Sequence, residues 1–384
     1  MRIFKHHSIV LLSILLLIIS PVSIFAQKVE VLEFPGPVVF PDTPAMTQEN
    51  AHPDSKRRVI LESLKQRDID SLVAKGCKQR KQLQHARSFE CPESVKMEGN
   101  ARAARVFHIT GLDSSMQIDA DDAWNAGFDG AGARVVILDS GVQADHAELA
   151  DHFLGGYDFV NEDGIPEDGN GHGTHVAGII AGKGINVISG KQAKGVAFGS
   201  DFYMLKVCNS GGTCYEDDIF AALEYAVNTI DASIISMSLG GGNFGNHCDA
   251  DPLADKVNWA VDQGYTVVVA AGNEGSGVSS PACASKAIAV GAVNADDVVT
   301  SFSNRGSALD IVAPGNLIFS TYSCLAAGNC GSTWYATMTG TSMATPHVAG
   351  VVALLLGKNP SLSDDEIKDA LYSTAHPASG CAYC

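Results

Sequence analysis

The chain has 384 residues, 46% of them hydrophobic, and a formal net charge of −17 at pH 7. This length fits a targeting segment, an accessory region and one large domain, and the hydrophobic share indicates a globular protein with a sizeable core. Residues 56–105 carry 13 Lys or Arg against 6 Asp or Glu, whereas residues 114–384 carry 10 against 31. The acidic main region argues against nucleic acid as a partner, and it is itself the nearest partner for the basic stretch.

The N-terminus has the features of a secretory signal peptide. Two basic residues precede an apolar run over residues 9–19, which is short for a membrane span, and no second run of spanning length follows. We therefore predict a signal peptide over residues 1–26 and a secreted mature protein without a membrane span. Residues 27–55 are rich in proline and predict a linker, and residues 56–87 predict a basic, helical stretch.

Ten cysteines follow the signal peptide, and export makes disulfides the expected state of an even number of thiols. Pairs that are close in sequence close short loops at little entropic cost. This favours Cys208–Cys214 and Cys324–Cys330, and also places Cys77 near Cys91 and Cys381 near Cys384. Cys248 and Cys283 then remain as a long-range pair, and no paired CxxC zinc pattern is present.

From residue 133 onward, short runs rich in Val and Ile alternate with helical segments. The runs cover 133–138, 202–207, 233–239, 266–271 and 287–293, and the helical segments cover 172–182, 216–228 and 251–263. Continuous apolar runs separated by helices predict an α/β fold, a doubly wound and mostly parallel sheet with helices on both faces. A capping box from Ser363 to Glu366 predicts one more helix near the C-terminus.

The stretch GTSMATPHVAGVVALLL, residues 340–356, predicts a helix that is buried on all sides. Pro346 has no N–H for the carbonyl of Ser342, so Ser342 must lie in the first turn of this helix. Ser342 or Thr341 could serve there simply as a helix cap. The unpaired N–H groups of a helix start also suit a developing anion, which would make Ser342 a nucleophile.

Three further residues support the second interpretation. Asp139 and Asn273 each follow an apolar strand, and His172 lies at a helix start in GNGHGTHVAG. Alone, each is adequately explained as a turn residue or a surface histidine. Together with Ser342 they supply an orienting carboxylate, a base, a nucleophile and an amide donor for an oxyanion, near the carboxyl ends of the strands.

Five motifs give the sequence a clear resemblance to the subtilases, the subtilisin-like serine peptidases, and within them to the secreted proteinase-K-like members. These are VVILDSGV, GHGTHVAG, SMSLGG, AAGNEG and GTSMATPHVAG, over about residues 119–375. The order Asp, His, Ser along the chain is the subtilisin order. The resemblance implies that Ser342 attacks the scissile carbonyl, His172 transfers the proton, Asp139 orients His172, and Asn273 with the Ser342 N–H binds the oxyanion.

Substrate contacts follow from the same resemblance. The segment Ser238-Leu239-Gly240 matches the edge that pairs with an extended peptide, and Gly212-Thr213 matches the opposite edge. The flanking Cys208 and Cys214 depart from the family pattern, so side-chain preferences do not carry over. No catalytic cofactor is implied.

A structural calcium site is implied at Asp310, with the carbonyls of Lys286 and Ile288 as companions. The acidic loop over residues 158–168 is either a second calcium site or a solvated loop. His172 and His175 lack the HExxH pattern of a zinc pair.

We therefore expect a secreted, monomeric serine endopeptidase acting on proteins or peptides, with its catalytic domain over residues 114–384. Residues 27–113 are either a spacer or a basic pro-region that inhibits the acidic catalytic domain until it is cut away. A catalytically silent peptide-binding relative is disfavoured because all four catalytic positions are filled. An α/β-hydrolase esterase would need Gly-x-Ser-x-Gly and the order Ser, Asp, His.

Overall fold

The computed structural model describes residues 56–63, 65–82, 86–92, 94–96, 99–103, 114–329 and 335–380. The predicted signal peptide and the proline-rich linker lie outside the described residues. The chain divides into two compact units, Met1–Val106 and Phe107–Cys384. Among the described residues, no helix is long and apolar enough to cross a membrane.

The first unit is a small antiparallel sheet with one helix. Its elements are β1 (Lys56–Leu61), α1 (Gln66–Ala74), β2 (Lys78–Gln82), β3 (Arg87–Pro92) and β4 (Ala101–Ala103), with strand order β2-β3-β1-β4. Val59 and Phe89 face each other in this sheet and are both fully buried. The prediction of a helical stretch over residues 56–87 is therefore correct only for α1, since β1, β2 and the start of β3 are strands. Lys and Arg favour helices locally, but burial between paired strands overrides this propensity.

The second unit contains a seven-stranded sheet in which every pairing is parallel, which confirms the predicted fold class. Its strand order is β15-β14-β12-β10-β5-β9-β6. The bounds are β5 (Arg134–Asp139), β6 (Phe153–Asp158), β9 (Asp201–Lys206), β10 (Ile234–Met237), β12 (Thr266–Ala270), β14 (Ile288–Val293) and β15 (Ile311–Pro314). All seven carboxyl ends consequently lie along one edge, where the predicted site residues follow their strands.

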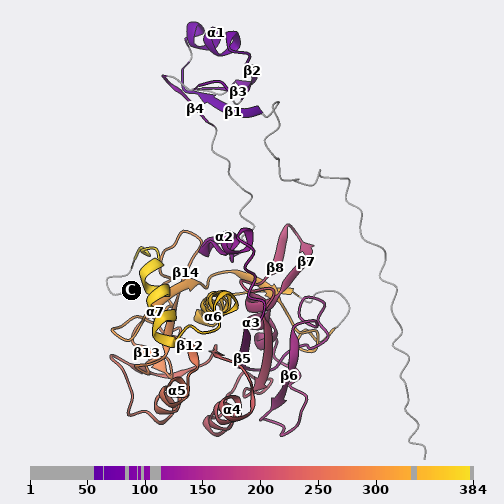
Figure 1. The fold of residues 1–384 in the computed structure, drawn as a ribbon, viewed down its shortest axis with the longest axis vertical. Helices are drawn as coiled ribbons and strands as arrows, with labels where there is room; N and C mark the ends of the chain where they lie inside the picture. Colours follow the sequence, from indigo (N-terminus) through magenta and orange to yellow (C-terminus); the bar gives the residue numbers. More distant parts are fainter. Residues whose placement is uncertain are drawn as a thin grey trace, which may run out of the picture. The chain divides into compact units, whose positions relative to one another are not determined.

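Helices cover both faces of this sheet (Figure 1). The alternation along β5 shows the two layers: Val135 and Ile137 pack with α3 (His172–Ala181) and α6 (Thr341–Lys358), whereas Val136 and Leu138 pack with α4 (Glu216–Thr229) and α5 (Pro252–Asp262). The predicted helices 172–182, 216–228 and 251–263 thus occur within a residue or so at each end. The remaining elements are η1 (Met116–Ile118), α2 (Ala120–Asn125), α7 (Asp364–Thr374) and three two-stranded pairs, β7 (Lys183–Ile188) with β8 (Lys191–Lys194), β11 (Gly241–Phe244) with β13 (Val278–Ser280), and β16 (Ile318–Thr321) with β17 (Tyr335–Met338).

Local signals in the sequence explain several of these boundaries. Ser363 caps α7 through the predicted capping box with Glu366. Three disulfides match the predicted pairs, Cys77–Cys91, Cys208–Cys214 and Cys248–Cys283. Cys324 is also disulfide-bonded, whereas Cys330, Cys381 and Cys384 lie outside the described residues.

Candidate active site

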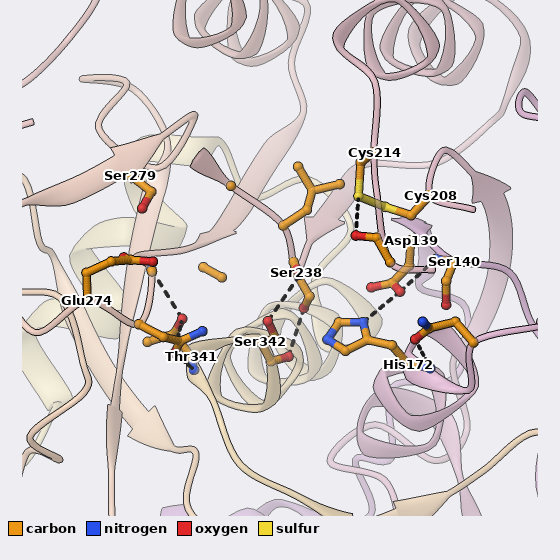
Figure 2. Close-up of a pocket in the computed structure, with 17 residues that line it drawn as sticks. Asp139, Ser140, His172, Cys208, Cys214, Ser238, Glu274, Ser279, Thr341 and Ser342 are labelled. Atoms are coloured by element: carbon orange, nitrogen blue, oxygen red, sulfur yellow. Dashed lines mark hydrogen bonds and ion pairs between the residues drawn. A yellow bond between two sulfur atoms is a disulfide. The ribbon is translucent and has the colours of Figure 1, made fainter. Parts of the chain in front are cut away.

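A pocket with a volume of about 250 Å³ opens at the carboxyl ends of β5, β10 and β12. These strands are neighbours in the sheet, so the residues that follow them meet at one place. Asp139 ends β5, Ser238 follows β10 and Asn273 follows β12. His172 from the start of α3 and Ser342 from the start of α6 line the same pocket (Figure 2).

Asp139 and His172 are in direct hydrogen-bonding contact in this pocket. His172 Nδ1 lies 2.7 Å from Asp139 Oδ1, which also accepts the Ser140 N–H at 2.7 Å. The Asp139 side chain is only 3% exposed, and that of His172 is 23% exposed. Burial by itself would lower the pKa of His172, but the charge of Asp139, its hydrogen bond and the charge of Asp168 raise that pKa above its usual value of 6.5.

Glycine at position 173 allows α3 to lie this close to β5. A Cβ atom on Gly173 would lie 2.2 Å from the Gly141 carbonyl oxygen and 3.1 Å from Asp139 Oδ1. A larger residue would push the helix start away from the strand end. The glycine-rich sequence around His172 therefore sets the distance between His172 and Asp139.

At the start of α6, a side-chain hydroxyl replaces the backbone donor that Pro346 lacks. Because Pro346 has no N–H, the Ser342 carbonyl lacks its helical donor, and the hydroxyl of Ser238 donates to it at 2.8 Å instead. The Ser342 hydroxyl in turn donates to the Ser238 carbonyl at 3.1 Å. To hydrogen-bond with His172, this hydroxyl must first rotate, as is common for catalytic groups in the absence of substrate.

Asn273 is held by the residue that precedes Ser342. The Thr341 N–H donates to Asn273 Oδ1 at 2.9 Å, and the Thr341 hydroxyl lies 3.2 Å from the same oxygen. This contact fixes which end of the Asn273 amide faces α6. Among the described residues Nδ2 has no acceptor, so it remains for a ligand in the pocket, which Ser342 at the start of α6 also lines.

Sequence reasoning missed the role of Asp168, which it placed in the acidic loop. The Asp168 carboxylate is fully buried and accepts five hydrogen bonds. The donors are the Ser140 hydroxyl, the backbone N–H groups of Asn170 and Gly171, and the N–H and hydroxyl of Thr174. Asp168 thus ties the first turn of α3, which carries His172, to the residue after Asp139. A carboxylate just before a helix start was the available sequence signal.

The two predicted substrate edges differ in whether their backbone groups are already hydrogen-bonded within the protein. Ser238, Leu239, Gly240 and Gly212 all line the pocket. Both backbone groups of Thr213 bind Asn209: its carbonyl accepts the Asn209 N–H at 2.9 Å, and its N–H donates to Asn209 Oδ1 at 3.1 Å. Together with the Cys208–Cys214 disulfide, these bonds close the loop on itself.

The residues around Asp310 do not fit the predicted calcium site. The Lys286 carbonyl, one of the expected ligands, accepts a hydrogen bond from Lys368 Nζ, and this ammonium group pairs with Asp364 at 2.6 Å. Asp310 Oδ2 accepts the Ala289 N–H at 2.8 Å. Burial raises the pKa of Asp310, while the charge of Lys368 is among the effects that lower it. A side-chain ammonium group, supplied by α7, therefore already provides positive charge at this position.

Two carboxylates of the acidic loop accept hydrogen bonds from backbone N–H groups of the same loop. Asp158 is fully buried and accepts the N–H groups of Val160 and Asn161, at 2.8 and 2.9 Å. The exposed Asp163 accepts the N–H of Ile165 at 2.8 Å. Residues 161–165 and 167 are exposed, which agrees with the solvated-loop alternative, and two of the carboxylates also organise turns.

Comparisons with known proteins identify the family of this chain. The model of the subtilase family matches residues 130–382. Thermitase from Thermoactinomyces vulgaris is 40% identical over 267 residues, which cover 69% of this chain and 88% of thermitase. Subtilisin DY from Bacillus licheniformis is 40% identical over 264 residues, which cover 67% of this chain and 89% of that protein.

A solved structure points the same way. The crystal structure of a cold adapted subtilisin-like serine proteinase is similar with a TM-score of 0.56 and 35% identity, over 65% of this chain and 84% of that one. The α/β-hydrolase esterase alternative is wrong, because the chain matches the model of the subtilase family. The chain belongs to the subtilase family, and it is a serine-type endopeptidase that needs no catalytic cofactor.

Proposed function

We propose that this chain is a secreted endopeptidase of the proteinase-K-like kind, in which Asp139, His172 and Ser342 form the catalytic triad. The observation that carries the proposal is the 2.7 Å contact between Asp139 Oδ1 and His172 Nδ1 in a pocket that Ser342 also lines. The family motifs around all three residues support it. The predicted signal peptide over residues 1–26 and the disulfides support secretion.

In the proposed mechanism, the Ser342 hydroxyl turns away from Ser238 and gives its proton to His172 Nε2 as Ser342 Oγ attacks the scissile carbonyl carbon. Asp139 holds the Nδ1–H tautomer and stabilises the imidazolium. Asn273 Nδ2 and the Ser342 N–H donate to the oxyanion. His172 then protonates the leaving amine. In the second half, His172 takes a proton from water as this water attacks the acyl carbonyl carbon, and returns it to Ser342 Oγ as the acyl–oxygen bond breaks and the acid product leaves.

Protein or peptide substrates would bind as an added strand along Ser238, Leu239 and Gly240. Gly212 would line the opposite side of the substrate. Thr213 would shape this side through the closed loop, since its backbone groups already bind Asn209. The chain would act as a monomer. The charge of Asp310 would be balanced by Lys368 in place of the predicted structural calcium ion.

The proposed domain organisation is a signal peptide over residues 1–26, a linker and pro-region over 27–113, and a catalytic domain over 114–384. A start at Ser114 is supported by its hydroxyl, which lies 2.7 Å from His347 Nε2 of α6. The basic residues 56–105 are the complement in charge of the acidic catalytic domain. The pro-region would inhibit the enzyme until it is cut away.

The test is Ser342→Ala in the purified protein, with casein and a panel of peptide and ester substrates. In subtilisin, loss of the nucleophile costs about 2 × 10⁶ in kcat, and a loss of that order is expected here. Asn273→Ala is expected to cost about 10²–10³, by the same precedent. Peptidase activity that survives Ser342→Ala would refute the proposed triad.

A further inference from the structure

The disulfide Cys208–Cys214 forms part of the wall of the active-site pocket. Figure 2 shows it next to Asp139, on the side of the pocket that also carries His172. Cys208 follows the end of β9 and Cys214 precedes the start of α4, and the two residues pair in a single antiparallel β-bridge. The disulfide therefore closes the base of the loop over residues 209–213, called the substrate loop below because it contains a predicted substrate edge.

The substrate loop is connected to the backbone of two residues of the proposed triad. At its base, the Cys208 N–H donates to the Asp139 carbonyl at 3.2 Å. At its outer side, the Ser210 carbonyl accepts a hydrogen bond from Asn170 Nδ2 at 3.0 Å, and Asn170 Oδ1 accepts the His172 N–H at 3.3 Å. A loop that the disulfide holds in place is therefore also held in place relative to Asp139 and His172.

Without the disulfide, the substrate loop would depend on hydrogen bonds to Asn209. Asn209 Oδ1 accepts the N–H groups of Gly211 and Thr213, at 2.9 and 3.1 Å. Most of the loop is exposed, so water competes for these bonds and each adds little net stability. Reduction would also lengthen the stretch of chain that must be held, from the loop alone to the whole connection between β9 and α4. A longer connection has a higher entropic cost of being held in one shape.

Cys214 is the most accessible of the described cysteines. It is half-buried and lines the open pocket, and its Sγ lies 3.9 Å from the Gly212 carbonyl oxygen. The other described cysteines are all buried: Cys77, Cys91, Cys208, Cys248, Cys283 and Cys324. A thiolate can attack only a sulfur that it can reach, so the disulfide in the pocket should be reduced before the buried ones.

We infer that the Cys208–Cys214 disulfide positions the substrate loop and is open to reduction by thiols, so that its reduction weakens the peptidase. In the reaction, one thiolate of a dithiol reductant attacks Cys214 Sγ, and the S–S bond breaks as Cys208 leaves as a thiolate. The second thiol of the reductant then displaces Cys214. Two electrons and two protons pass to the protein, both cysteines end as thiols, and the reductant becomes a disulfide.

This role rests on the proposed function, since it concerns the regulation of that same site. A mobile loop must be ordered again each time an extended substrate binds, so reduction should raise KM and leave kcat nearly unchanged. We expect kcat/KM for a peptide substrate to fall by roughly threefold to tenfold. The enzyme would then be weak in a reducing compartment before export and would gain full activity in an oxidising one.

The experiment measures kcat and KM for a peptide that spans the pocket, before and after mild treatment with dithiothreitol. The rate at which a small fluorophosphonate labels Ser342 is measured alongside, because this reagent needs the triad but does not extend to the substrate loop. A general structural defect lowers both quantities, whereas release of the loop lowers kcat/KM and leaves the labelling rate unchanged. Alkylation with iodoacetamide and peptide mapping then show which disulfide has opened, and Cys208 and Cys214 are expected to be modified first.

The control is a double variant, Cys208→Ser with Cys214→Ser, which cannot form this disulfide and keeps the other cysteines. It should have the KM of the reduced wild type, and dithiothreitol should not change that value further. A double variant that cleaves the peptide as well as the oxidised wild type does, or buried disulfides that open first, would overturn the inference. If the oxidised wild type neither cleaves the peptide nor is labelled at Ser342, the proposed function itself fails.

Discussion

The Asp168 carboxylate offers a sharp test of how the site is held together. Asp168→Asn keeps the shape of the side chain but replaces one oxygen with an NH2 group. Whichever way the amide turns, it faces at least one backbone N–H, that of Thr174 on one side or those of Asn170 and Gly171 on the other. Each buried donor that loses its acceptor costs about 1–3 kcal/mol, so we expect the free energy of unfolding to fall by about 2–5 kcal/mol.

The same substitution should move the pH profile of activity. The charge of Asp168 is one of the effects that raise the pKa of His172, so its removal lowers that pKa. His172 must be neutral to accept a proton, and a lower pKa keeps it neutral in more acidic solution. The acid limb of kcat/KM should therefore shift to lower pH in Asp168→Asn, while the maximal rate falls because the start of α3 is less well held.

Urea unfolding in a Ser342→Ala background, which prevents self-digestion, measures the first effect, and kcat/KM against pH in the active protein measures the second. Asp163→Asn is the matched control. Asp163 lies in the same loop, and its carboxylate accepts the N–H of Ile165. It should change stability little and leave the acid limb in place. If Asp168→Asn unfolds and titrates like the wild type, the five contacts do not support the site.

Two other predictions follow from contacts outside the pocket, and a third follows from the charge of the predicted pro-region. Lys368→Met removes the ammonium group beside Asp364, whose Oδ1 is buried and has no hydrogen-bond partner among the described residues. The melting temperature should therefore fall, and added calcium should raise it in this variant and not in the wild type. Burial lowers the pKa of His347 to about 4, so the folded state favours the neutral form. The free energy of unfolding should therefore fall by about 3 kcal/mol as the pH falls from 6.5 to 4. His347→Gln cannot be protonated, so its urea midpoint should decline less over this range. A peptide of residues 27–113 should inhibit the mature enzyme at low ionic strength and less so in salt; no inhibition at micromolar peptide would leave this segment a spacer.

The sequence was informative where the determining contacts are local or periodic. Apolar runs gave the strands, and polar residues at their ends gave Asp139 and Asn273, because parallel strands bring their carboxyl ends together. The bonds of Asp168 with Asn170, Gly171 and Thr174 are local and could have been predicted from its position before a helix start. Its bond with the Ser140 hydroxyl could not, because these two residues meet only in the fold. Lys368 was missed for the same reason: it reaches the Lys286 carbonyl from a different element. The strands of the first unit, such as β1, depend on pairing with distant residues.

The turn after β12 couples two tasks that the sequence presents as separate. Asn273 and Glu274 are consecutive, and Asn273 Oδ1 binds the N–H of Thr341 at the start of α6, while Glu274 binds Asn304. The Gly272 N–H closes the same unit by donating to the Thr341 hydroxyl at 3.2 Å. The proposed oxyanion donor, the start of α6 and Glu274, which lines the same pocket, therefore share one hydrogen-bonded frame. A substrate residue that fills the pocket would therefore present its carbonyl to the same frame that holds Asn273 and Ser342.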